Sequence, residues 1–226
     1  AAQILALIGA SGGLGVSCLT VALSTRAADT GLRSAAVELA GCGGGLDLLF
    51  GAETQVGMTW EELRHAVGEI GDLTPHLVSA ERVSVLALGR PHGDSPDEAA
   101  LSAVLRSLER SHDMVVVDLG DGARLAELGR RAVPLLMVGA DVRSVAAARM
   151  RARRIDLTGA LLVVRVGKGR GLPPEAVSDA LGLPLAGVVR DDPRVPRLAA
   201  QGASVGSRPA ARLRRDSTRL LKEVRL

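Results

Sequence analysis

The sequence predicts an α/β protein with a doubly wound, mostly parallel sheet and helices on both faces. Short apolar runs of strand length alternate with longer segments of helical periodicity along the 226 residues, which is the order that parallel strands and crossover helices produce. A glycine-rich turn at residues 9–15 joins the first run to the first helix, and a later apolar run ends at Asp118. Because carboxyl ends of central strands meet in such sheets, we expect both features at one site.

Each expected strand is a short, mostly apolar run without a polar alternation. This pattern is typical of a strand that is covered by helices on both faces. The expected strands are residues 4–8, 34–39, 83–87, 114–118, 135–139, 160–166 and 185–189.

Helices are expected between the strands, where start signals precede periodic apolar residues. Thr59 and Glu62 form a capping-box pattern, and Pro96 is expected at the first position of the following long helix. Gly31 and Gly182 mark helix ends. The expected helices are residues 16–28, a short segment after 59, 95–111, a basic segment after 141, a short segment ending at 182, a segment between 191 and 202, and 210–226.

Composition bounds the class of protein. With 47% hydrophobic residues, the chain is long enough to bury a full core, and residues 1–226 are expected to form one domain. No apolar run has the length of a membrane span, and no signal peptide is present. The two cysteines, Cys18 and Cys42, lack metal-ligand spacing and fit a reducing compartment. A cytoplasmic location is therefore expected. Cys18 is expected to pack within the first helix. The chain begins at a strand without Met, which indicates a piece of a longer protein.

Charge is distributed unevenly along the chain. Residues 1–142 hold 10 basic and 18 acidic side chains, a net charge of −8, and residues 143–226 hold 18 and 7, a net charge of +11. The basic part is compatible with nucleic acid, anionic lipid or an acidic partner, and equally with a solvated surface. With Phe50 and Trp60 as the two aromatic residues, base stacking on single strands is disfavoured. The helix at 210–226 suits either a membrane surface or the sheet, and its few bulky apolar residues favour the sheet.

The turn after the first strand has the features of a phosphate-binding loop. Gly12, Gly13 and Gly15 let the backbone approach an anion closely, and the following helix presents N–H groups and partial positive charge. Ser17 stands where such loops keep the hydroxyl that binds Mg²⁺. A tight strand-to-helix connection would explain the glycines equally well. The aspartate that ends the 114–118 run, a Walker B pattern, favours the nucleotide interpretation.

These motifs resemble the ParA/MinD family of P-loop NTPases, whose deviant Walker A motif is K-G-G-x-G-K-[ST]. The resemblance runs from residue 4 to about residue 206 and implies ATP or ADP with Mg²⁺, the metal being held by Ser17 and Asp118. The residues that it implies for nucleotide contact are Gly12, Gly13, Leu14, Gly15, Val16, Ser17, Cys18 and Asp118.

This chain departs from the family pattern at three functional positions. Ser11 and Val16 replace the two lysines, and Ala40 replaces the carboxylate that positions the attacking water, while Glu38 keeps the first acidic position. Each lost lysine–phosphate contact removes about 1.5–3 kcal/mol of binding. We therefore expect weak or no nucleotide binding and no catalytic residue. The run 163–165 also lacks the adenine-reading Asn of the family. Possible substitutes for the lysines are Arg33, Arg124 and Arg143.

Within the ParA/MinD family, the chain most resembles the CpaE/TadZ and actinobacterial septum-site-determining (Ssd) proteins. That resemblance implies a receiver-like domain before residue 1, a homodimer, and protein partners in cell division or Tad pilus assembly. It implies a spatial organiser recruited to the inner membrane, pole or septum, with membrane or DNA contact through the basic C-terminal part. The alternative is a working ATPase that cycles on membrane or DNA.

Overall fold

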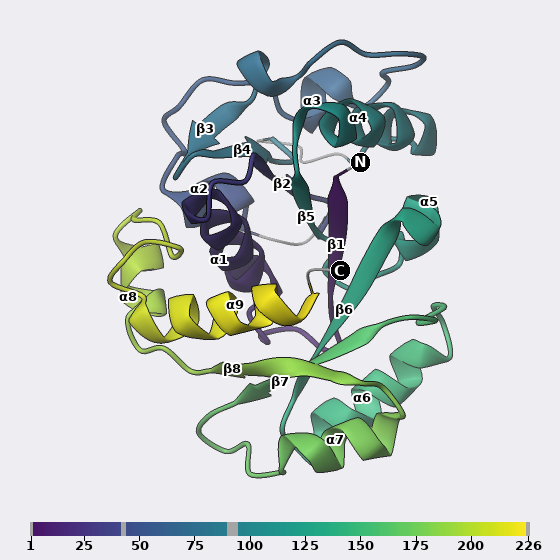
Figure 1. The fold of residues 1–226 in the computed structure, drawn as a ribbon, viewed down its shortest axis with the longest axis vertical. Helices are drawn as coiled ribbons and strands as arrows, with labels where there is room; N and C mark the ends of the chain where they lie inside the picture. Colours follow the sequence, from purple (N-terminus) through teal and green to yellow (C-terminus); the bar gives the residue numbers. More distant parts are fainter. Residues whose placement is uncertain (1, 42–43, 90–94, 225–226) are drawn as a thin grey trace.

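The sheet at the centre of the molecule confirms the predicted fold class (Figure 1). A computed structural model describes residues 2–41, 44–89 and 95–224, and within them the strand order is β3-β4-β2-β5-β1-β6-β7-β8. All neighbouring pairs are parallel except β3 with β4. The strands are β1 (Gln3–Gly9), β2 (Ser34–Glu38), β3 (Val78–Ala80), β4 (Val83–Leu86), β5 (Met114–Asp118), β6 (Ala132–Gly139), β7 (Leu161–Val166) and β8 (Leu185–Arg190).

Helices cover both faces of the sheet (Figure 1). α1, α2 and α9 pack on one face, and α4, α6 and α7 pack on the other. The helices are α1 (Val16–Asp29), α2 (Leu46–Phe50), α3 (Trp60–Leu63), α4 (Glu98–Ser111), α5 (Leu125–Leu128), α6 (Val142–Ala152), α7 (Pro174–Leu181), α8 (Val195–Ala200) and α9 (Ala211–Val224). The middle strands are therefore buried on both faces, which explains their uninterrupted apolar sequences.

Two details differ from the sequence expectations. The expected start of α4 at Pro96 is wrong: the N-cap is Asp97, whose carboxylate accepts a hydrogen bond from the Ala100 N–H at 2.7 Å, and Pro96 lies before it. An aspartate side chain satisfies a free N–H of the first turn directly, so it sets the start. The short antiparallel strand β3 was not predicted. The capping box of Thr59 and Glu62 is present as expected.

The C-terminal helix packs on the sheet, as the sequence favoured. α9 lies against β8 and α1 and buries Leu213, Leu220, Leu221 and Val224. The buried carboxylate of Asp216 accepts a hydrogen bond from the Arg190 backbone N–H at 2.9 Å and pairs with the Arg190 guanidinium. The apolar face of α9 is thus used inside the fold, which argues against the membrane-surface interpretation. Among the described residues, no helix combines the length and hydrophobicity that crossing a membrane requires.

Candidate functional site

The loop between β1 and α1 forms a concave run of backbone N–H groups. Gly13 and Gly15 have φ of 75° and 85°, which side-chain-bearing residues rarely adopt, so glycine is needed at both. Gly15 is also the N-cap of α1, and no side chain caps this helix. Within the described chain, no acceptor is found for the N–H groups of residues 12–17. Free N–H groups at a helix start are the usual partners of a phosphate.

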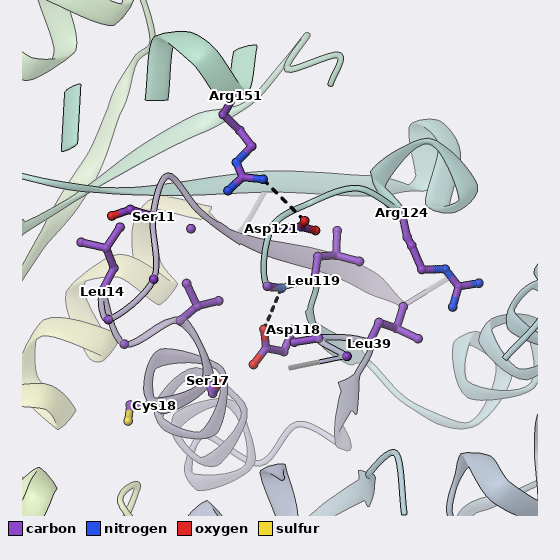
Figure 2. Close-up of a pocket in the computed structure, with 18 residues that line it drawn as sticks. Ser11, Leu14, Ser17, Cys18, Leu39, Asp118, Leu119, Asp121, Arg124 and Arg151 are labelled. Atoms are coloured by element: carbon purple, nitrogen blue, oxygen red, sulfur yellow. Dashed lines mark hydrogen bonds and ion pairs between the residues drawn. The ribbon is translucent and has the colours of Figure 1, made fainter. Parts of the chain in front are cut away.

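This loop borders a cavity of about 510 Å³ at the carboxyl ends of the central strands. Figure 2 shows the loop on one side of the cavity and the β5–α5 connection on the other. Every residue that the family resemblance placed at the nucleotide site lines the cavity, including the three substituted positions. The lining is Gly9, Ser11, Gly12, Gly13, Leu14, Gly15, Val16, Ser17, Cys18, Leu39, Ala40, Gly41, Asp118, Leu119, Gly120, Asp121, Arg124 and Arg151.

Asp118 is fully buried beside the loop and is only half satisfied. Its Oδ1 accepts a hydrogen bond from the Gly120 N–H at 3.0 Å, and its Oδ2 has no partner among the described residues. Burial raises the pKa of Asp118, and the Ser17 hydroxyl and the Gly120 N–H oppose that rise. A buried, unpartnered carboxylate oxygen close to a serine hydroxyl is a donor set that suits Mg²⁺. The residues therefore fit the implied metal, which would be held by Ser17 and Asp118.

Replacing Asp118 by asparagine is expected to stabilise the metal-free protein by about 1 kcal/mol, because the amide nitrogen supplies a donor toward Ser17 in place of an unpaired oxygen. A raised folded-state pKa means that stability is lost as pH rises from the ordinary value of 3.8 through the folded value. The gain should therefore be present at pH 7 and disappear below pH about 4. Urea denaturation at both pH values, with and without Mg²⁺, measures it. Stabilisation by Mg²⁺ that survives in the variant would contradict the metal assignment.

The substituted positions line the cavity without supplying charge. A Val16 methyl lies 3.0 Å from where a Cβ on Gly9 would stand, so the valine side chain packs against the backbone of Gly9. The Ala40 methyl lies close against Gly120. The Glu38 carboxylate is used elsewhere, because it accepts a hydrogen bond from the Leu88 N–H at 3.1 Å, and burial raises the pKa of Glu38. No carboxylate from the end of β2 is thus found among the described residues of the cavity lining.

Arginines, rather than lysines, lie around the cavity. Arg124, one of the expected substitutes, lines it and pairs with Glu127. Arg33 instead pairs with Asp113 at the amino ends of the strands, and Arg143 is exposed on α6, outside the lining. Arg151 was missed by sequence reasoning because no motif marks its position in α6. Arg124 and Arg151 are thus the two arginines among the described residues of the cavity lining.

The thiol of Cys18 lies in the first turn of α1, next to the loop. It is partly buried and packs against both hydrophobic clusters, as the sequence suggested. Burial raises the pKa of the Cys18 thiol, and Arg165 opposes this rise. The thiol is therefore held in its neutral form, which suits packing better than nucleophilic chemistry. Cys42 lies outside the described residues. No cluster of three or more metal-ligating His, Cys, Asp or Glu side chains occurs in the described part of the chain.

A glycine-rich loop follows the central strand β1 and lies beside the aspartate that ends the neighbouring strand β5, and this chain has the fold of the MinD and ParA ATPases. The MinD cell division ATPase of Pyrococcus furiosus has a TM-score of 0.78 and 20% identity, with 99% of this chain and 98% of that chain covered. MinD in the MinC:MinD complex of Aquifex aeolicus has a TM-score of 0.78 and 18% identity, covering 98% and 94%. The ParA family ATPase of Chlorobium tepidum has a TM-score of 0.75 and 13% identity, covering 98% of each.

Sequence comparison finds a relative of higher identity than these structures. The uncharacterized protein Rv3660c of Mycobacterium tuberculosis is 34% identical over 199 residues, which are 85% of this chain and 55% of the relative. This chain therefore spans about half the length of the curated relatives that it matches. No family model matches the chain.

Proposed function

We propose that this chain is a ParA/MinD family member related to the CpaE/TadZ and Ssd proteins, and that it acts as a spatial organiser with weak or no ATP hydrolysis. One observation carries the proposal: the cavity keeps the loop, Ser17 and Asp118, but its described lining contains no lysine and no carboxylate from β2. A site of this kind can hold an anion and lacks the groups that accelerate its hydrolysis. Its role would be in septum-site determination or in placing a Tad pilus or secretion system.

The proteins that share this fold support the proposed role. One of these structures is a cell division complex of MinC with MinD, and another is a septum site-determining protein MinD complexed with Mg-ADP. By analogy, the present chain would act through contact with division or Tad proteins, in the cytoplasm and at the inner membrane, pole or septum. A receiver-like domain before residue 1 belongs to the same proposal. The exposed arginines of α6 would contribute to contacts of its basic C-terminal part with a membrane or DNA.

The protein is expected to form a homodimer whose mass in solution does not change on addition of ATP. Ser11 cannot reach the phosphates of the other subunit as the family's signature lysine does, so apolar and Arg–carboxylate contacts must hold the dimer. Light scattering with and without Mg-ATP, at low and high salt, measures whether dimer formation depends on ATP or on charge. Dimers that form only with ATP would overturn the organiser proposal.

The rate of ATP hydrolysis provides a second test of the proposed function. Phosphate release should stay near the level of a Ser17→Ala variant, because neither protein has the charged groups that stabilise the transition state. Turnover at rates typical of the family, lost on Ser17→Ala, would instead establish the cycling ATPase. Light scattering and phosphate release therefore separate the two functions independently.

A further inference from the structure

One histidine lies buried at the amino ends of the strands, where α4 leads into β5. His112 is the C-cap of α4 and is 3% exposed, whereas the side chain of His65 is 77% exposed and His76 is exposed as well. The fourth histidine, His92, lies outside the described residues. Imidazole is the side chain whose charge ordinarily changes between pH 5 and 8. His112 is therefore the one histidine of the described chain that would carry this charge inside the fold.

The His112 ring connects two elements that are distant in the sequence. Its Nδ1 lies 3.2 Å from the Leu108 carbonyl oxygen and 3.0 Å from the Ser111 Oγ, both on α4. Its Nε2 lies 2.9 Å from the Ser84 Oγ on β4. Because a carbonyl oxygen can only accept, we assign the proton of the uncharged ring to Nδ1, and Nε2 then accepts a hydrogen bond from the Ser84 hydroxyl. The uncharged ring thus satisfies hydrogen bonds to α4 and to β4 at the same time.

Burial and three charged side chains act on this ring. Burial is the largest influence and lowers the pKa of His112. Asp72, which precedes the short helix η1 (Thr74–His76), and Asp113 favour a positive charge on the ring, and Arg33 opposes one. Arg33 and Asp113 form an ion pair at 2.8 Å, so their opposite effects largely cancel. Asp72 is thus the acid toward which a charged ring would be drawn.

A second cavity, of about 780 Å³, lies beside the histidine. Asp72 and Arg33 line this cavity, and so does Ser111, whose hydroxyl contacts the His112 ring. The ring is therefore separated from an open, polar space by a single side chain. Turning toward this space would bring a protonated ring to water and to a carboxylate, and it would leave the Ser84 hydroxyl without its acceptor.

We propose that His112 is a pH-sensitive latch between α4 and β4. The uncharged ring holds the two elements together through Leu108 and Ser84, and the protonated ring turns toward Asp72 and the cavity and releases β4. The near-complete burial of the ring, its bridge from α4 to β4 and the polar cavity on one side carry this assignment. The latch is independent of the proposed function, because it lies at the amino ends of the strands and the glycine-rich loop lies at their carboxyl ends.

Hydrogen exchange of the full chain at pH 7.5 and pH 5.0, corrected for the intrinsic pH dependence of exchange, tests the latch. A lowered folded-state pKa means that the stability given by the uncharged ring is present above the ordinary value of 6.5 and is lost as pH falls through the folded value. We expect amides of β3 and β4 to lose more than about threefold of their protection at pH 5.0, while β1 and β6 keep theirs. Equal loss in all strands, or no loss in β4, would overturn the proposal.

Two histidine variants separate the latch from general effects of acid. His112→Gln keeps an amide that can reach Ser84 but cannot take up a proton, so protection of β4 is expected to differ by less than about twofold between the two pH values. His65→Gln removes an exposed histidine and should keep the parent response. A response that persists in His112→Gln, or that disappears in His65→Gln, would overturn the assignment.

Nuclear magnetic resonance titration of the parent protein tests the same group without a substitution. The His112 ring is expected to titrate below the ordinary value of 6.5, because burial lowers its pKa, and its titration should coincide with the loss of protection in β4. A midpoint at or above 6.5, or a titration that leaves the β4 amides unchanged, would show that this histidine is no latch.

Discussion

Replacing Val16 by lysine is expected to tighten ATP binding by about ten- to hundredfold, the largest functional change that one substitution should produce here. A charge-assisted lysine–phosphate contact contributes about 1.5–3 kcal/mol, and a factor of ten corresponds to about 1.4 kcal/mol. The substitution is placed at the cavity because Val16 is one of its lining residues and starts the helix that follows the loop. Calorimetric titration with Mg-ATP measures the gain.

Val142→Lys is the matched control for this experiment. Val142 is 73% exposed on α6 and outside the cavity lining, so the same change of side chain should alter affinity by less than about twofold. Turnover should remain low in Val16→Lys, because Ala40 still supplies no carboxylate to orient water. A Val16→Lys variant that binds no more tightly than the parent would show that the loop cannot accept a phosphate.

Trp60→Ala is expected to lower the free energy of unfolding by about 3–5 kcal/mol, the range for a large buried aromatic residue. Trp60 is fully buried in the main core, and its Nε1–H donates to the carbonyl oxygen of Glu38 at 2.8 Å. The residue thus ties α3 to the carboxyl end of β2, two residues before Ala40 in the cavity wall. Urea denaturation followed by far-ultraviolet circular dichroism measures the loss without relying on tryptophan fluorescence.

Trp60→Phe separates packing from hydrogen bonding. The phenyl ring keeps much of the apolar contact and leaves the Glu38 carbonyl without its donor, so a smaller loss of about 1–3 kcal/mol is expected. If the alanine variant cost less than about 1 kcal/mol, the docking of α3 on the core would contribute little to stability. If the two variants cost the same, the hydrogen bond would account for most of the effect.

The fold of this chain does not depend on charged side chains at Ser11, Val16 and Ala40. Loop shape depends on glycines at positive φ, and the sheet depends on apolar strands, so neither needs Ser11, Val16 or Ala40 to be charged. Fold and function are thus separable here, because the scaffold is stable whatever side chains stand at these three positions. Asp118 is buried with an unpaired carboxylate oxygen, which lowers the stability of the metal-free protein. A metal ion held by Asp118 and Ser17 would explain why a buried carboxylate stands at this position.

Local sequence patterns predicted most of the architecture. The apolar runs at β1 and β5 needed no knowledge of their neighbours, because a strand buried on both faces must be apolar throughout. The loop after β1 was predictable because positive φ at Gly13 and Gly15 is a local requirement. Asp118 was predictable from its place at the end of a strand, since parallel strands bring their carboxyl ends to one edge.

Other features depend on contacts between segments that are distant in the sequence, and no local pattern marks them. β3 has three residues, and its pairing with β4 rather than its composition makes it a strand. Arg151 reaches the cavity because α6 packs on β6, whereas Arg143 on the same helix faces solvent. The pairing of Arg165 with Asp191 joins the ends of β7 and β8. Which arginine faces a ligand is thus a consequence of helix packing, because a side chain's partners are set by the elements around it.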